Sequence, residues 1–132
     1  MTGEKNLAKL LQAMSPALLD AEYVFCCLEG SRYGDHLNLE PIAAFAEREG
    51  LTLVITKSKA DEYGISYESV FRCITLNVHS SLEAVGLTAA FSTKLGEHGI
   101  SANVIAGYYH DHIFVQAELA GKAIAAINEL TR

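Results

Sequence analysis

The segment with the clearest potential for chemistry is residues 79–88, which link an apolar stretch to a helical pattern. Gly86 stands at the start of that pattern, where a helix exposes unpaired backbone N–H groups that attract a carboxylate. His79 opens the segment, and Ser80, Ser81 and Thr88 add hydroxyl donors. The same residues also suit a structural turn, in which a serine caps the backbone and Gly86 relieves crowding. The segment is therefore either an anion-binding loop or a structural turn.

A second polar group, Tyr108-Tyr109-His110-Asp111-His112, interrupts two apolar runs. An ionised Asp111 would pair with an ammonium group, or it would close an Asx turn between two strands. His110 and His112 share one face if the strand is regular there, and His79 would supply a third metal ligand if its loop folds over. This spacing is not a zinc signature, so the sequence favours partly exposed structural histidines.

Little in the chain indicates catalysis. A Gly-rich phosphate loop and a nucleophile elbow are both absent from the sequence. The cysteines Cys26, Cys27 and Cys73 are expected to be buried free thiols, whereas a reactive thiolate needs exposure and a basic neighbour. We therefore expect a protein that is not an enzyme and that carries no metal or other cofactor.

Charge and hydropathy restrict the partners. The formal net charge is −6, and only ten Lys and Arg residues are scattered over 132 positions. Nucleic acid and anionic membrane surfaces both require clustered positive charge, so neither is expected as a partner. No run approaches the ~18 apolar residues of a spanning helix, and the first 14 residues lack the apolar core of a signal peptide. These features predict a cytoplasmic protein.

The second half has the more regular pattern. Residues 71–78 alternate as a strand, residues 86–98 carry a helical apolar stripe, and Gly99 is suited to end that helix. Strands are predicted at residues 101–107 and 112–118, and a second helix at residues 120–130. This order is βαββαβ without its last strand, which predicts an α+β sandwich with helices on one face of an antiparallel sheet.

The first half is less regular. A short helix is predicted at residues 4–14, a buried strand at residues 22–28 and a glycine-bearing loop at residues 30–38. Residues 41–55 fit either a hairpin that turns at Glu49-Gly50 or a helix that ends at Gly50 and is followed by a strand. The hairpin is favoured because the residues after Lys57 are too few for another strand and a full helix before residue 71, and it leaves residues 59–64 as a short helix.

Several of these segments resemble the ACT domain of aspartokinase regulatory regions. They are the strand ITLNV, Gly86 at a helix start, the Gly99-Ile100-Ser101 entry to the next strand, and the turn HDHIFV. The whole chain is also similar to small bacterial stand-alone proteins with two ACT-like units, in which segments like HSSLEAVGLTA and AGYYHDH recur. The resemblance implies two ferredoxin-like units, a degenerate one at residues 1–68 and a second at residues 69–132.

The resemblance also implies a function. ACT domains usually bind amino acids and usually pair through shared sheets, so it implies an amino-acid-binding regulatory protein that forms a homodimer or a higher homo-oligomer. The ligand would lie between residues 79–88 and a strand at residues 101–107, with Asp111 on its amino group. Two alternatives stay open, a metal protein that uses the HDH turn and an interaction module that binds no small ligand. The implied site comprises His79, Ser80, Ser81, Val85, Gly86, Leu87, Thr88, Asn103, Val104, Ile105, His110 and Asp111.

Overall fold

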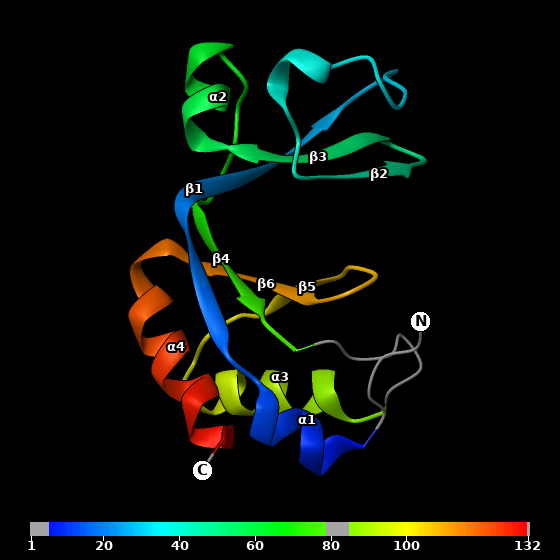
Figure 1. Ribbon diagram of the computed structural model, residues 1–132. Coiled ribbons are helices and arrows are strands. Elements are labelled where there is room, and N and C mark those ends of the chain that lie inside the picture. The colour runs from blue at the N-terminus through cyan, green and yellow to red at the C-terminus, as the bar shows by residue number, and fades with distance from the viewer. Residues whose placement is uncertain (1–5, 79–84, 132) are drawn as a thin grey trace. The chain divides into compact units, whose positions relative to one another are not determined.

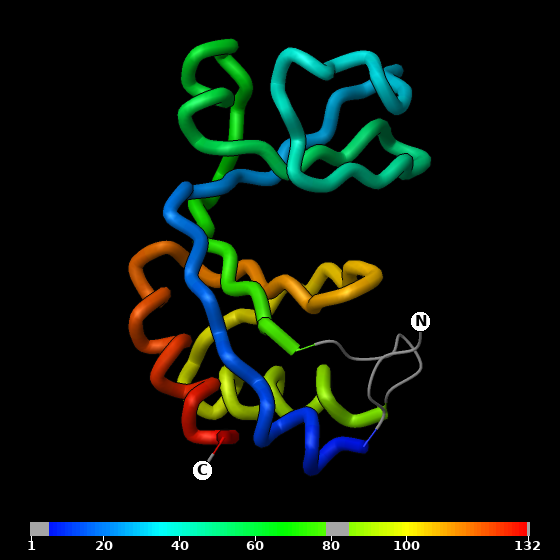
Figure 2. The backbone as a smooth tube through the Cα atoms, in the orientation of Figure 1, coloured from blue at the N-terminus to red at the C-terminus, as the bar shows by residue number. Residues whose placement is uncertain are grey.

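The computed structural model describes residues 6–78 and 85–131. Its chain divides into two compact units, one formed by residues 1–20 with 72–132 and the other by residues 21–71. Strand β1 (Pro16–Leu28) passes from the first unit into the second, and strand β4 (Phe71–Leu76) leads the chain back (Figures 1 and 2). The sequence predicted two consecutive units with a boundary between residues 68 and 69. The packing instead groups residues up to 20 with the second half of the chain.

The larger unit contains a sheet in the order β1-β4-β6-β5. Strand β5 (Asn103–Ala106) and strand β6 (Asp111–Gln116) form an antiparallel hairpin in which Ala106 lies opposite Asp111. The Asn77 amide donates to the Ser15 carbonyl at 2.8 Å, which fits an antiparallel pairing of β1 with β4. The strand that the βαββαβ pattern lacks is therefore supplied by the first residues of β1.

Three helices cover one face of this sheet: α1 (Leu7–Ala13), α3 (Leu87–Glu97) and α4 (Ala120–Asn128) (Figure 1). Short 3-10 turns flank α4 at Ala117–Leu119 and Glu129–Thr131. The strands contribute alternate apolar residues to this face, as expected for a sheet with one buried side. The shared core includes Leu10, Met14, Ile74, Leu76, Leu87, Phe91, Leu95, Ile113, Val115, Ala123 and Ile127.

The smaller unit has the strand order β2-β3-β1. Strand β2 (Ala43–Glu47) turns back into β3 (Gly50–Thr56), and a 3-10 turn at Leu37–Leu39 precedes them. The antiparallel register of Glu47 with Gly50 confirms the predicted hairpin and excludes the helical alternative, although the turn is at Arg48-Glu49, one residue earlier than predicted. A side chain at Gly50 would meet the Cys27 Sγ and the Leu28 carbonyl oxygen at 2.9 Å, so glycine permits the close approach of β3 to β1.

Helix α2 (Lys57–Glu62) follows β3 directly, two residues earlier than the sequence predicted. The Thr56 hydroxyl oxygen accepts a hydrogen bond from the Lys59 amide at 3.2 Å, so Thr56 is the N-cap that ends the strand and begins the helix. The core of this unit lies between the sheet, α2 and the 3-10 turn, and it includes Val24, Leu39, Leu51, Leu53, Ile55 and Ala60.

Arg72 of β4 is half-buried, and its Nε and Nη2 donate to the Leu19 carbonyl oxygen at 3.2 and 2.8 Å. One expectation about exposure was wrong. Cys27 was expected to be buried and is exposed, because successive side chains of β1 alternate between the two faces of the sheet. The buried thiols are Cys26 and Cys73, and all three cysteines are free.

Candidate functional site

The β5–β6 turn carries the polar cluster that the sequence singled out. The Gly107 amide donates to the His110 carbonyl oxygen at 2.9 Å, which closes the turn. A Cβ atom at Gly107 would lie 3.0 Å from that same oxygen and 3.2 Å from His112 Nε2. Any larger residue would therefore crowd the turn, and glycine at this position allows His110, Asp111 and His112 to gather in a small volume.

Strand β4 and the residues just after it hold both histidines of the turn. His110 Nδ1 lies 3.3 Å from the Val78 carbonyl oxygen, so this ring nitrogen is the donor. His112 Nδ1 lies 2.9 Å from the Thr75 hydroxyl. Burial lowers the pKa of His112 below its usual value, and the neighbouring His110 lowers it further. These contacts support the structural interpretation of the two histidines, because each has a ring nitrogen in a hydrogen bond to residues 75–78.

Asp111 lies between them with its carboxylate half-buried. Burial raises the pKa of this carboxyl above its usual value, and the nearby His112 and His110 only partly oppose the effect. Within residues 6–78 and 85–131, the structure gives the Asp111 carboxylate neither a hydrogen bond nor an ion pair. A half-buried carboxylate of this kind is poised to accept hydrogen bonds from a cationic group.

The described part of the predicted loop is residues 85–88, and in it Gly86 lies next to α1. Gly86 is the N-cap of α3 with φ 99°, a conformation that favours glycine, and a Cβ atom there would lie 3.0 Å from Leu7 Cδ2. Leu87 is buried in the core, whereas Val85 and Thr88 are exposed. Gly86 thus serves the packing of α3 on α1. His79, Ser80 and Ser81 lie outside the described residues.

The predicted strand residues lie on β5. Asn103 is exposed, and its Nδ2 donates to the Phe114 carbonyl oxygen at 3.3 Å, so this side chain is held against β6. Val104 and Ile105 are half-buried, and Ile105 lies opposite His112 in the hairpin register. Ile105 and Asp111 therefore both lie near the turn end of the hairpin, but their side chains lie on opposite faces of it, because Ile105 is paired with His112 and Asp111 with Ala106.

The sequence did not single out Thr75 and Val78, although they hold the two histidines. The alternation of residues 71–78 indicated a strand but not its partners. Thr75 and His112 are 37 residues apart in the sequence, and only the fold brings them together. In the part of the chain that the structure describes, no three His, Cys, Asp or Glu side chains are placed to share a metal ion. That part also contains no helix long and apolar enough to cross a membrane.

Comparison with known families decides the classification. Two models of the ACT domain match the chain, one at residues 2–72 and one at residues 68–129. The chain belongs to the ACT-domain family. Its α+β architecture, with antiparallel strands and helices, is the ferredoxin-like fold that the sequence predicted. No curated protein matches the chain.

Three solved structures share the fold of this ACT-domain protein. A protein of unknown function from Vibrio cholerae is 59% identical, with 97% of this chain and 98% of that chain covered and a TM-score of 0.88. The ligand-free regulatory subunit of aspartate kinase from Thermus thermophilus is 11% identical, with coverages of 91% and 99% and a TM-score of 0.67. Aspartate kinase from Clostridium acetobutylicum is 12% identical over 90% of this chain and 34% of the enzyme, with a TM-score of 0.63. The two distant likenesses show the fold alone, and membership of the ACT-domain family favours a ligand-binding regulatory role.

Proposed function

We propose that this ACT-domain protein is a non-enzymatic regulator that binds a small molecule with an ammonium and a carboxylate group, most simply an amino acid. The observation that carries the proposal is the half-buried Asp111 carboxylate, which has no hydrogen-bond donor in the described part of the chain. A ligand ammonium would supply the charge-assisted hydrogen bonds that offset the burial of this group.

The other end of the ligand would be bound by residues 79–88. The described parts of that segment are residues 85–88, of which Val85 and Thr88 are exposed. Val85 and Val104 would contribute apolar contacts, whereas Leu87 belongs to the core and the side chains of Asn103 and Ile105 lie on the other face of the hairpin from Asp111. We further propose that the protein acts as a homodimer or a higher homo-oligomer, because β5 is the outer strand of its sheet and an open edge favours pairing with another chain. Light scattering on the purified protein tests the oligomer independently of the ligand.

The ligand proposal is tested by thermal-shift measurements against the twenty amino acids at millimolar concentration. A ligand that binds only the folded protein raises the unfolding temperature according to its concentration and affinity. The variant Asp111→Asn should weaken binding about 10- to 100-fold, because a hydrogen bond to a charged group is worth about 1.5–3 kcal/mol.

Asp20→Asn is the matched control, since Asp20 is exposed in the same unit and the substitution removes the same charge. Binding by Asp20→Asn should equal that of the native protein. If no amino acid stabilises the native protein, or if Asp111→Asn responds as strongly as the native chain, the proposed site is wrong.

A further inference from the structure

The smaller unit contains a cleft of about 490 Å³ that is distant in sequence from the Asp111 turn. It opens beside the middle of β1, where β3 ends at Thr56 and α2 begins at Lys57. Tyr23 pairs with Thr56 in the antiparallel register, so Glu22, the residue before Tyr23, lies next to the end of β3. Ala21 leaves room there because its side chain is a single methyl group. The cleft is lined by Ala21, Glu22, Thr56, Lys57, Ser58 and Asp61, all within the smaller unit.

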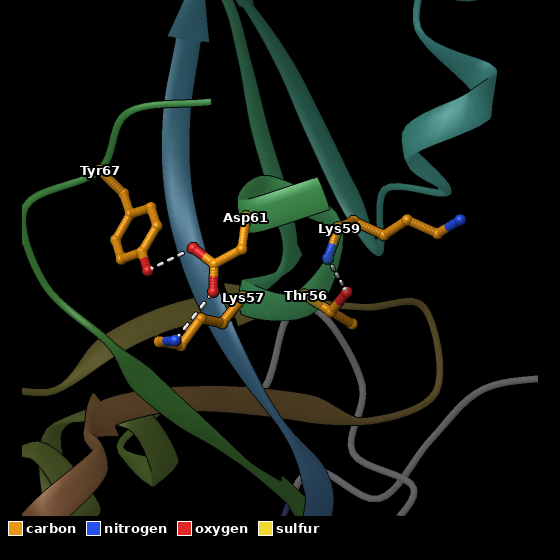
Figure 3. Close-up of polar contacts among 5 residues, drawn as sticks. All are labelled: Thr56, Lys57, Lys59, Asp61 and Tyr67. Carbon is orange, nitrogen blue, oxygen red and sulfur yellow. Dashed lines mark hydrogen bonds and ion pairs between the residues drawn. The ribbon is translucent and has the colours of Figure 1, made fainter. Parts of the chain in front are cut away.

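One wall of the cleft is organised by Asp61 (Figure 3). Lys57 Nζ donates to Asp61 Oδ2 at 2.9 Å, and the Tyr67 hydroxyl donates to Asp61 Oδ1 at 2.8 Å. Both carboxylate oxygens are therefore engaged. The hydrogen bond from Lys57, followed by that from Tyr67, lowers the pKa of Asp61, so this carboxylate stays ionised while it holds the Lys57 ammonium in place.

Lys59 belongs to the other side of the helix. Its side chain points away from Lys57 and Asp61 in Figure 3, and its Nζ lies 3.8 Å from Glu40 Oε1. The positive charge of the cleft is therefore that of Lys57, which Asp61 already balances. The exposed Glu22 makes no ion pair within residues 6–78 and 85–131, so the lining carries one unbalanced negative charge.

Two hydroxyl groups complete the polar lining. The Thr56 oxygen accepts the Lys59 amide and keeps its own proton free to donate, and Ser58 is exposed beside it. A ligand that fits this lining has a cationic group for Glu22 and a neutral or negative oxygen for the hydroxyls and for Lys57. A bare metal ion fits poorly, because fewer than three His, Cys, Asp or Glu side chains of the described chain converge here.

We propose that this cleft is a second binding site, which takes a small primary amine that also carries an oxygen acceptor. The ammonium binds the Glu22 carboxylate, and the oxygen accepts hydrogen bonds from Ser58 or Lys57. The site is independent of the amino-acid site proposed at Asp111, because its lining comes entirely from residues 21–61. The cleft is open to solvent, so binding is expected to be weak, because water screens an exposed ion pair.

The test is an NMR titration of the amide signals of the full chain with ethanolamine. Ethanolamine should shift the signals of Glu22 and of residues 56–61, whereas sodium acetate at the same ionic strength should not. Glu22→Lys should weaken ethanolamine binding at least about fivefold, because an attraction becomes a repulsion. Glu62→Lys is the matched control: Glu62 is an exposed residue of the same short helix that does not line the cleft, and this variant should bind ethanolamine as the native chain does.

The experiment also separates the two sites. Asp111→Asn should leave the ethanolamine shifts at residues 56–61 unchanged, so a failure of the amino-acid site does not affect this result. The second site is refuted if ethanolamine shifts other residues instead, if Glu22→Lys binds it as well as the native chain, or if acetate produces the same shifts.

Discussion

The substitution Gly86→Ala tests whether this glycine is required by the backbone. Gly86 has φ 99° at the N-cap of α3, a conformation that L residues rarely adopt. Holding a residue with a side chain in such a conformation costs about 1–3 kcal/mol. The new methyl group would also lie 3.0 Å from Leu7 Cδ2, but this atom is the end of a flexible side chain and can move by a few tenths of an ångström. We therefore expect a loss of about 1–3 kcal/mol in the free energy of unfolding, mostly from the backbone.

The assay is urea denaturation followed by far-ultraviolet circular dichroism. Gly96→Ala is the control in the same helix: Gly96 lies inside α3, and a Cβ atom there would meet no atom within 4 Å. Alanine is a better helix former than glycine, so Gly96→Ala should stabilise the protein by about 0.5–1 kcal/mol. The two Gly→Ala substitutions should thus change stability in opposite directions.

A double-mutant cycle with Leu7→Ala separates the two causes. If the backbone conformation dominates, Gly86→Ala should cost nearly the same with Leu7 as with Ala at position 7. If the cost disappears in the Leu7→Ala background, the contact with α1 is responsible. Equal or greater stability of Gly86→Ala compared with the native protein would refute the reasoning altogether.

Three further predictions concern the core, the thiols and pH. Phe91→Ala should reduce the free energy of unfolding by about 3–5 kcal/mol in urea denaturation, because this fully buried ring packs between helices and sheet; a loss below 1 kcal/mol would contradict the described core. In titration with a thiol reagent at pH 8, the exposed Cys27 should react first, and Cys73, whose pKa burial raises to about 11, should react only after unfolding; early modification of Cys73 would be inconsistent with its burial. Burial lowers the folded-state pKa of His112 below the unfolded value of 6.5. The stability that the neutral His112 contributes is therefore fully present above pH 6.5 and is lost as the pH falls from 6.5 through the lowered folded-state pKa. The urea midpoint of His112→Gln should consequently fall less between pH 7 and pH 5 than that of the native protein, and an equal fall would assign the acid sensitivity to other groups.

Local patterns explain why much of the fold could be predicted. The apolar stripe of α3 and the alternation of β6 are properties of consecutive residues, and the hairpin at Gly50 followed from the short distance to the next strand. The first residues of β1 were missed because Pro16 and Asp20 weaken the strand pattern, and because the strand that pairs with them lies more than 50 residues away. Arg72, for example, reaches a carbonyl acceptor 53 residues distant.

The candidate sites show the same division. Asp111 could be singled out because a charged residue between two apolar runs is visible in the sequence. The cleft beside Glu22 could not, because it exists only through the register of β1 with β3 and the turn into α2. The pairing of Lys57 with Asp61 at i,i+4 was a local signal, but such pairs are common on exposed helices and do not by themselves indicate a cavity.

The path of β1 has a consequence for the order of events during synthesis. Residues 6–20 leave the ribosome before residues 21–71, but the core that receives Leu10 and Met14 includes Ile113, Val115 and Ile127, which are translated after both. Residues 21–71 make up a compact unit of their own and can complete its contacts while translation continues. To assemble the larger unit, residues 6–20 must meet residues 72–131 across a loop of more than 50 residues. This step is slow because the chain loses conformational entropy on closing the loop before it gains the free energy of packing. Helix α1 and the first part of β1 are therefore made before the smaller unit but packed after it.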